Sequence, residues 1–387
     1  MTTRLRDLRI RTGRPAGRRD MPLGSDIMTP AEPRSPARPL DAEGLRSRVD
    51  KVLDDVLARQ ADLLDEVSDD LSPLMVALID LMRGGKRLRP AFCYWGWRGA
   101  DGGDVAEIVN VAAALELFQA AALVHDDVMD GSDTRRGHPA VHRRMSAQHR
   151  GRGLLGSSET FGVAAAILAG DLCLSWCDEM YAGSGLPAED LLRGRSVFDR
   201  MRTELMCGQY LDMLESAKAV TTVERARHVI LYKSAKYSVA QPLLLGGTLA
   251  GAPAALLRTY DSFGRALGEA FQLRDDVLGV FGDPASTGKP AGDDLREGKR
   301  TVLVALTLQR CSPKEAAAVR AGLGDPRLGA EGVDAMRAVI VGSGALAEVE
   351  ELIASQAGAA RELLSEVDEP ARTVLDQLVD AATVRAG

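Results

Sequence analysis

The sequence predicts an all-α protein built as a single large helical domain. Aromatic residues make up only 4% of the 387 residues, so the aromatic-rich runs that are typical of strands are scarce. The long segments instead repeat Ala, Leu, Val, Arg and Glu at the spacing of a helix that buries one face. With 45% of the chain hydrophobic, there is enough material for one large core, although the length alone would also allow two domains.

Composition also limits the class of protein. The chain carries 48 Lys and Arg against 55 Asp and Glu, a net charge of −7, which disfavours a nucleic-acid-binding protein. Its five cysteines are an odd number without paired spacing, so we expect a reducing, cytoplasmic compartment and no disulfide framework. No stretch reaches about 18 uninterrupted apolar residues, and we therefore expect no integral membrane segment.

The N-terminal part of the chain divides into a tail and a first helical region. Residues 1–40 are rich in Arg, Pro and Gly, which predicts a disordered tail before a helical domain over residues 41–387. From Asp41 onward, apolar residues recur on one stripe, which predicts a packing helix. A short helix over 73–82 then leads into a basic turn at a pair of glycines, Gly84-Gly85.

An alanine-rich run from Val105 to Val124 predicts a buried helix that ends in an acidic stretch. If this helix continues, Asp126 and Asp130 lie on one face, with Asp127 beside them. Three like charges repel one another, and hard divalent cations, which prefer oxygen ligands, explain such a cluster better than stability does. A solvated, charged helix end is the alternative for this motif taken alone.

The middle of the chain predicts one loop and several helices. Residues 138–161 contain several glycines and lack apolar periodicity, which predicts a mobile loop with exposed histidines. Helices are predicted over 161–181, 187–217 and 222–249, and Ala-rich packing helices over 312–387. Polar residues on these apolar helices cost stability unless they are paired, so we expect some of them to line a cavity. These residues are Gln209, Asp212, Lys233 and Ser234.

A second acidic cluster, Asp275-Asp276, ends another apolar stretch that begins near Ser262. Two such clusters on separate helices can face each other. Basic residues lie between and around them, and Lys and Arg take up phosphate charge where divalent metals bridge phosphate oxygens. This combination predicts at least one diphosphate ligand. The basic residues are Lys86, Arg89, Arg135, Arg136, Lys233, Lys289 and Lys299.

The order of these motifs resembles that of the trans-isoprenyl diphosphate synthases of the polyprenyl synthetase family, closest to the geranylgeranyl diphosphate synthases. The resemblance covers roughly residues 45–310. Each motif alone is weak, whereas the ordered set is highly specific. The motifs are Gly84–Pro90, Asp126–Asp130, Gly208–Asp212, Lys233–Ser234, Asp275–Asp276 and Gly288–Thr301.

This resemblance implies a fold of the isoprenoid synthase type, with antiparallel helices around a central catalytic cavity. It implies a Mg²⁺-dependent prenyltransferase, in the form of a homodimer, that condenses isopentenyl diphosphate with allylic diphosphates head to tail. Geranylgeranyl diphosphate is the favoured product, and a farnesyl or longer-chain polyprenyl diphosphate synthase is the first alternative. A class I terpene cyclase and a non-catalytic synthase subunit are less favoured, because the chain is poor in aromatics and keeps both acidic motifs.

The resemblance also implies roles for individual residues that match the family motifs. The implied metal-binding residues are Asp126, Asp127, Asp130, Asp275 and Asp276. The implied catalytic residues are Asp126, Asp127, Asp130, Lys233, Gln272 and Asp275. The implied substrate-binding residues are Lys86, Arg89, Gln119, Arg135, Arg136, Lys233, Ser234, Gln272, Lys289 and Lys299.

One position departs from the family pattern. The second motif is usually Asp-Asp-x-x-Asp, but its last position here is Gly279, with Asp283 four residues further on. In the family, the first aspartate of this motif is most directly tied to metal, so we expect Asp275 to keep metal binding intact. The substitution Gly279→Asp is expected to be tolerated.

The helix of the first motif also carries the residues expected to set product length. Ala122 and Ala121 lie four and five residues before Asp126, where farnesyl-forming relatives commonly carry a bulky aromatic, and Phe118 lies eight before. Helical rise places Phe118 about 4.5 Å deeper than Ala121, on the order of one isoprene unit. A phenyl ring at that depth predicts geranylgeranyl diphosphate as the product. The alternative is an ordinary core aromatic that points away from the tunnel.

Overall fold

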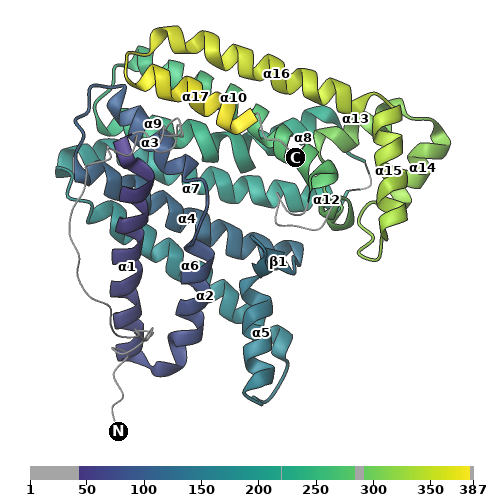
Figure 1. Ribbon diagram of the computed structural model, residues 1–387, viewed down its shortest axis with the longest axis horizontal. Helices are drawn as coiled ribbons and strands as arrows, with labels where there is room; N and C mark the ends of the chain where they lie inside the picture. Colours follow the sequence, from purple (N-terminus) through teal and green to yellow (C-terminus); the bar gives the residue numbers. More distant parts are fainter. Residues whose placement is uncertain (1–42, 219, 284–291, 384–387) are drawn as a thin grey trace, which may run out of the picture. The chain divides into compact units, whose positions relative to one another are not determined.

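The structure, a computed structural model, describes residues 43–218, 220–283 and 292–383. Regular structure in these ranges is helical apart from one hairpin of two-residue strands, which confirms the all-α prediction. The predicted tail over residues 1–40 and the predicted substrate-binding residue Lys289 lie outside the described residues. All the elements drawn in Figure 1 belong to one compact unit, Arg38–Gly387.

The elements up to the second acidic motif come in the following order. They are α1 (Leu45–Val67), the 3₁₀ turn η2 (Asp69–Leu71), α2 (Ser72–Met82), α3 (Leu88–Arg98), α4 (Ala106–Asp130), β1 (Thr134–Arg135), β2 (His138–Pro139), α5 (Val141–Gly151), α6 (Ser158–Ala182), α7 (Ala188–Ser216), α8 (Val223–Val229), the π-helix η3 (Ile230–Ala240), α9 (Gln241–Leu249) and α10 (Ala254–Phe281). The helix predicted at the first acidic motif therefore runs without interruption through that motif.

The remaining elements form the C-terminal part. They are α12 (Asp293–Glu297), α13 (Val302–Arg310), α14 (Pro313–Gly322), α15 (Ala330–Gly342), α16 (Ala345–Leu363), the 3₁₀ turn η4 (Leu364–Glu366) and α17 (Ala371–Thr383). Helix α16 runs along α10 (Figure 1), and Arg274 of α10 donates two hydrogen bonds to Glu350 of α16, at 2.7 and 2.6 Å. Apolar residues of α10 and α12–α16 form a core cluster together, which confirms the predicted packing helices.

Two helices of the described residues, α4 and α6, are long and apolar enough to cross a membrane by length and composition alone. In α4, 72% of the apolar window is buried within the protein, as expected for a core helix, and its neighbours include α1, α3 and α6. In α6, only 39% of the window is buried. Helix α6 therefore leaves an apolar face exposed, with Phe161, Ile167 and Leu168 on it.

The loop predicted over residues 138–161 is wrong for most of its length. The segment contains the second strand of the hairpin and α5, and α6 already begins at Ser158. Val141, Met145 and His149 are buried at four-residue spacing, so α5 packs through one face. His142 is also buried. The pattern was missed because histidines occupy buried positions that an apolar stripe would normally fill.

The single helix predicted over residues 222–249 consists of three segments. α8 is followed by η3, an 11-residue π-helix, and then by α9. A π-helix is wider than an α-helix, is rare, and frequently occurs at functional sites. Its side chains therefore leave the helix in directions that the 3.6-residue spacing of the sequence does not predict.

Candidate active site

Asp126, at the end of α4, lies in a hydrogen-bonded group that α7 and η3 complete. Its Oδ1 accepts a hydrogen bond from Gln209 Nε2 at 2.9 Å and lies 3.2 Å from Lys233 Nζ. Lys233 Nζ also lies 2.5 Å from Asp212 Oδ2. Two carboxylates, one ammonium group and one amide thus meet at one place. Three of the polar residues that were expected to line a cavity, Gln209, Asp212 and Lys233, belong to this group.

The position of Lys233 depends on a close approach between η3 and α7. A Cβ atom on Gly208 of α7 would lie 2.5 Å from the backbone nitrogen of Lys233. Such a distance is too short for any side chain, so the glycine allows the two backbones to touch. This contact brings Gln209, the next residue on α7, beside Lys233. Ser234 follows on η3 and is partly buried.

Asp127 is buried and paired with Arg135. Its side chain is 2% exposed and accepts a hydrogen bond from Arg135 Nε at 2.8 Å. Arg135 Nη2 also lies 3.3 Å from Asp126 Oδ2, so one guanidinium group holds both carboxylates. The hairpin places Arg135: Arg136 and Gly137 at its turn both have positive φ, as tight hairpin turns require.

The second acidic motif lies near the end of α10. Asp276 is buried and accepts a hydrogen bond from Gln272 Nε2, one turn earlier, at 2.7 Å. Burial, together with the nearby charges of Asp294 and Asp275, raises the pKa of Asp276 well above its usual value. Asp275 is less buried than Asp276. The two neighbouring carboxylates are therefore in different environments.

Lys299 connects the first acidic motif with α12, the short helix that follows the second motif in the chain. Its Nζ lies 3.6 Å from Asp130 Oδ2 on α4, and on α12 it lies 3.6 Å from Asp294 Oδ1 and 2.8 Å from Glu297 Oε2. Ser132, just after α4, donates a hydrogen bond to Glu297 Oε1 at 2.9 Å. The first motif and the segment that follows the second motif therefore share one site.

Asp126 and Asp130, two implied metal-binding residues of the first motif, have pKa values shifted in opposite directions. Burial raises the pKa of Asp130 to about 6, and the neighbouring charge of Asp126 acts in the same direction. Burial also opposes ionisation of Asp126, but nearby cations, Lys233 first among them, outweigh it and hold the pKa of Asp126 below its usual range. Two close carboxylates cannot both ionise at low cost. Additional positive charge at Asp130 would therefore be stabilising.

These carboxylates fit a divalent metal ion that shares its coordination with a diphosphate. Asp130 Oδ2 is buried and accepts no hydrogen bond from the described residues. Among the described residues, no three acidic, His or Cys side chains converge into a metal cage. Mg²⁺ is usually bound through one or two carboxylates, with substrate phosphates and waters completing its octahedron, so a partial set of this kind suits it.

A second polar group lies at the start of α3. Arg89 Nη2 donates a hydrogen bond to Ser238 Oγ at 2.7 Å, and its guanidinium carbon lies 4.3 Å from the ring centroid of Tyr237. The Tyr237 hydroxyl donates a hydrogen bond to Gln119 Oε1. Arg89 and Gln119, two of the implied substrate-binding residues, thus both contact one tyrosine.

Arg136 and Lys86 lie at the glycine turn that precedes α3. Arg136 Nη1 donates a hydrogen bond to Leu81 O at 2.7 Å, and a Cβ atom on Gly85 would lie 3.3 Å from Arg136 Nη2. Lys86 follows Gly85 and is exposed. The structure therefore brings Arg136 to the same turn as Lys86, although the hairpin is far along the chain.

The residues predicted to limit product length lie on α4 next to this group. Phe118 is buried and packs edge to face against Tyr237, with ring centroids 5.4 Å apart. Ala121 is buried and Ala122 is partly buried. The ring of Phe118 therefore contacts the tyrosine that holds Arg89 and Gln119.

Gly279 is packed directly against Asp294. A Cβ atom at position 279 would lie 1.9 Å from Asp294 Oδ2 and 2.4 Å from Asp294 Cγ. Non-bonded atoms do not approach so closely, so any side chain at position 279 would displace Asp294. The atoms met are the outer end of a side chain, so the expected tolerance of Gly279→Asp stays a prediction, and it requires Asp294 to move aside.

Sequence reasoning gave no role to Tyr237, Asp294 or Glu297. A weak signal for each was present: Tyr237 follows Lys233 by one helical turn, and the two acidic residues lie within the Gly288–Thr301 motif. Their roles depend on contacts with α3, α4 and α10, which spacing along the chain does not predict.

Comparison with known proteins agrees with the geometry of the site. Residues 73–340 match the family model described as polyprenyl synthetase. The chain belongs to the polyprenyl synthetase family. As a member of this family it is a trans-prenyltransferase that uses isoprenyl diphosphates and a divalent metal ion.

Similar proteins cover most of the chain. A short chain isoprenyl diphosphate synthase of Methanothermobacter thermautotrophicus is 32% identical, over 72% of this chain and 83% of that protein. A geranylfarnesyl diphosphate synthase of Aeropyrum pernix is 32% identical, over 82% and 95%. The structure of geranylgeranyl pyrophosphate synthase from Corynebacterium glutamicum, complexed with isoprenyl diphosphate and magnesium, superposes with a TM-score of 0.85 at 40% identity, over 90% of this chain and 99% of that chain.

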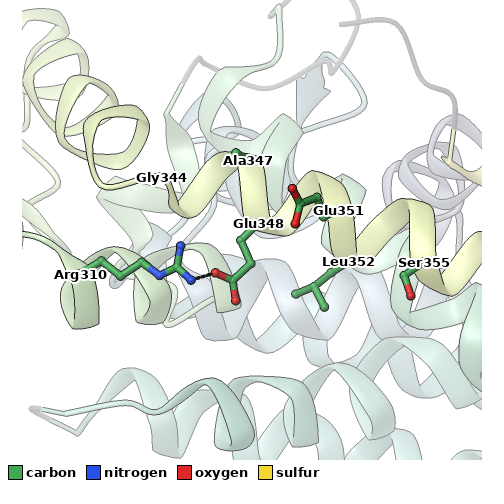
Figure 2. Close-up of a pocket in the computed structure, with 7 residues that line it drawn as sticks. All are labelled: Arg310, Gly344, Ala347, Glu348, Glu351, Leu352 and Ser355. Atoms are coloured by element: carbon green, nitrogen blue, oxygen red, sulfur yellow. Dashed lines mark ion pairs between the residues drawn. The ribbon is translucent and has the colours of Figure 1, made fainter.

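A separate groove of about 570 Å³ lies between α13 and α16. Figure 2 shows its lining, with an ion pair between Arg310 and Glu348. The lining residues are Arg310, Gly344, Ala347, Glu348, Glu351, Leu352 and Ser355. This set includes none of the family-motif residues, so the groove is distinct from the candidate active site.

Proposed function

We propose that this prenyltransferase condenses isopentenyl diphosphate with allylic diphosphates head to tail, with Mg²⁺ as its metal and geranylgeranyl diphosphate as its main product. One observation carries the proposal: Lys233 and Lys299 lie among the carboxylates at the end of α4, at distances of 3.2 and 3.6 Å. Mixed acidic and basic groups of this kind suit a metal-bound diphosphate. The magnesium in the similar Corynebacterium glutamicum structure supports the choice of metal.

The allylic diphosphate would bind between the two acidic motifs. Of the five implied metal-binding residues, Asp126, Asp130 and Asp275 would hold Mg²⁺, which supplies positive charge to the departing diphosphate. Asp127 and Asp276, the other two, are proposed to act through the side chains that they contact. Lys233, Lys299 and Arg135 take up the remaining negative charge. Arg135 is oriented for this by Asp127, and Gln272 is oriented by Asp276. Lys289 is also proposed to bind diphosphate, on the basis of its sequence motif alone.

Isopentenyl diphosphate would bind at the turn before α3. Lys86, Arg89, Arg136 and Gln119 are proposed to hold its diphosphate. Loss of diphosphate from the allylic substrate leaves a cation, which the double bond of isopentenyl diphosphate attacks, and the released diphosphate accepts the proton that is then lost. Ser234 and Gln272 can stabilise the cation through their side-chain dipoles. No protein nucleophile is required.

The product length follows from α4. With Ala121 and Ala122 in place of a bulky aromatic, the growing chain would extend until it meets Phe118. A tunnel longer by one helical turn accommodates about one more isoprene unit than a farnesyl diphosphate synthase does. We therefore propose geranylgeranyl diphosphate, with farnesyl and longer polyprenyl diphosphates as the other products to look for.

The active form is proposed to be a cytoplasmic homodimer. Helix α4 is largely buried within its own chain, whereas α6 exposes an apolar face. Phe161, Ile167 and Leu168 on this face are 42%, 45% and 60% exposed. A second copy that covers α6 would remove this apolar area from water.

A variant of Asp126 tests the proposed role of the first motif. Asp126→Ala is expected to reduce turnover with isopentenyl and geranyl diphosphates by at least about a hundredfold, because charge stabilisation of the leaving group is lost. Circular dichroism should show an intact fold. Asp133→Ala, which removes a carboxylate that is 79% exposed on the following turn, is the matched control and should keep full turnover. Normal turnover of Asp126→Ala would contradict the metal assignment.

A further inference from the structure

The turn before α3 carries three basic residues that differ in burial. Lys86 is exposed and Arg89 is partly buried, whereas the side chain of Arg87 is only 6% exposed. Lys86 and Arg89 are proposed to bind substrate, and Arg87, which lies between them in the motif, has no role in the proposed function. A charged side chain is rarely buried unless it is paired. The partners of Arg87 therefore indicate what it does.

All three guanidinium nitrogens of Arg87 donate hydrogen bonds to other parts of the protein. Nε donates to Asp50 Oδ1 on α1 at 2.8 Å, and Nη2 donates to Met82 O at the end of α2, also at 2.8 Å. Nη1 donates to Glu116 Oε2 on α4 at 2.6 Å, and the side chain of Glu116 is 5% exposed. One side chain thus connects the turn to three helices, through the planar fork of donors that is particular to arginine.

The backbone of this turn has a conformation that needs support. Gly84, Gly85 and Arg87 have φ values of 77°, 88° and 53°. Glycine adopts positive φ freely, but a large side chain there costs free energy and persists only where its surroundings hold it. Arg87 also begins α3, since the Ala91 N–H donates a hydrogen bond to Arg87 O at 3.1 Å. The hydrogen bonds of the Arg87 side chain therefore fix the direction in which α3 leaves the turn.

The partners of Arg87 lie beside other residues that are proposed to bind isopentenyl diphosphate. Glu116 lies one turn before Gln119 on α4, so its pairing with Arg87 fixes the turn against the helix that carries Gln119. At the end of α2, Arg87 shares the last carbonyl groups with Arg136, which donates a hydrogen bond to Leu81 O at 2.7 Å. The last carbonyls of a helix lack partners within it and favour cationic donors. The turn, α4 and the hairpin therefore meet through these contacts.

We infer that Arg87 is a positioning residue for isopentenyl diphosphate: it holds the turn that carries Lys86 and Arg89 in a fixed place against α4. This inference rests on the proposed role of that turn in binding the diphosphate group of isopentenyl diphosphate. Groups that bind one ligand together must keep their relative positions, and a displacement of about 1 Å can cost a large part of their effect. Arg87 acts through its two neighbours, and the allylic substrate, bound at the acidic motifs, does not depend on it.

Arg87→Lys tests this role with the charge retained. Lysine can still pair with Glu116, but its single nitrogen cannot reach acceptors on three helices. We measure initial rates with isopentenyl diphosphate varied at saturating geranyl diphosphate, and with the two substrates exchanged. The KM for isopentenyl diphosphate should rise by about tenfold or more. The kcat and the KM for geranyl diphosphate should change by less than about twofold, because only binding at the turn is weakened.

Arg361→Lys is the matched control for loss of an arginine that joins helices. Arg361, on α16, donates hydrogen bonds to Asp376 and Asp380 of α17, away from the turn. All three kinetic constants should keep their wild-type values in this variant. An unchanged KM for isopentenyl diphosphate in Arg87→Lys, or equal losses for both substrates, would overturn the inference.

A double variant separates positioning from stability. Arg87→Met alone leaves the charge of Glu116 buried without its partner and should lower the thermal unfolding temperature. Arg87→Met combined with Glu116→Leu replaces the buried ion pair by apolar side chains, which should restore that temperature. The KM for isopentenyl diphosphate should stay raised in both variants, because the hydrogen bond to Met82 O is lost in both. If the KM recovered together with the unfolding temperature, Arg87 would contribute only stability. Arg87→Lys decides the matter if the double variant does not fold.

Lys86→Ala and Arg89→Ala distinguish failure of this inference from failure of the proposed function. If both variants keep the wild-type KM for isopentenyl diphosphate, the proposed binding site itself is wrong. If they raise this KM while Arg87→Lys leaves it unchanged, the binding site stands and only the role of Arg87 is refuted.

Discussion

At the scale of single residues, Asp130 has a carboxyl group whose ionisation costs stability until a cation binds. Its pKa in the folded protein, about 6, lies above its ordinary value of 3.8 because burial and the charge of Asp126 oppose ionisation. The folded state therefore binds this proton more tightly than the unfolded chain does. In the metal-free protein, the stability contributed by protonated Asp130 therefore falls as the pH rises from about 4 through about 6. Above that range this contribution is lost in full.

The substitution Asp130→Asn should remove this cost. In EDTA at pH 8 it is expected to raise the free energy of unfolding by about 2 to 3 kcal/mol, and near pH 4 the gain should be close to zero. Urea denaturation at the two pH values measures the difference. Asp133→Asn, the same change at a carboxylate that is 79% exposed, is the matched control. A loss of stability at pH 8, or an equal gain at both pH values, would refute this description of Asp130.

At the scale of secondary-structure elements, the contact of α7 with η3 determines where Lys233 lies. The backbones touch at Gly208, where a Cβ atom would lie 2.5 Å from the Lys233 nitrogen and 2.6 Å from the Tyr232 carbonyl carbon. Backbone atoms cannot move aside as the end of a flexible side chain can. Any residue larger than glycine must therefore separate the two helices.

Gly208→Ala should move Lys233 away from Asp126 and Asp212. We expect a loss of about 1 to 3 kcal/mol of stability, as for other overpacked sites, and a fall in kcat. Steady-state kinetics and thermal unfolding measure these effects. The matched control is Gly358→Ala on α16, where a Cβ atom meets nothing within 4 Å and the change should be neutral or stabilising. Equal effects of the two substitutions would mean that the close approach is unimportant.

Helix α4 carries both the first acidic motif and the residues proposed to limit product length. Phe118→Ala should lengthen the products, and Ala121→Phe should shorten them towards farnesyl diphosphate, as measured by product chromatography. Phe118 contacts Tyr237, so a change in affinity for isopentenyl diphosphate is also expected in Phe118→Ala. Phe198→Ala, at a buried phenylalanine that stacks on Tyr181 instead, controls for lost packing and should not change product length. If the products of both α4 variants were unchanged, another helix would have to limit product length.

At the scale of the whole molecule, the exposed apolar face of α6 predicts self-association. Sedimentation at micromolar concentration should show a dimer, and Leu168→Glu should shift it to monomers because a charge would be buried in the interface. Leu192→Glu, at a leucine of α7 that is 76% exposed, is the control and should leave the dimer intact. A monomeric wild type, or a dimer unaffected by Leu168→Glu, would argue against this surface.

Helices with clear apolar patterns and residues within motifs could be predicted from the sequence. The alanine-rich run before Asp126 indicated α4, and spacing along α4 brought Asp126 and Asp130 to one face. Contacts between distant segments could not be predicted in the same way. The pairing of Asp127 with Arg135 depends on the hairpin, and the closeness of Gly279 to Asp294 depends on the packing of α12 against α10. Local patterns also failed where polar residues were buried, as at His142 and His149 of α5.

The most direct test of the central claim is an incubation of the purified full-length chain with labelled isopentenyl diphosphate and dimethylallyl, geranyl or farnesyl diphosphate in turn. Product chromatography is done with Mg²⁺ and with EDTA. We expect labelled geranylgeranyl diphosphate as the main product with Mg²⁺, and no product with EDTA. Cyclised hydrocarbons, or no labelled polyprenyl diphosphate from any of the three primers, would contradict the proposed function.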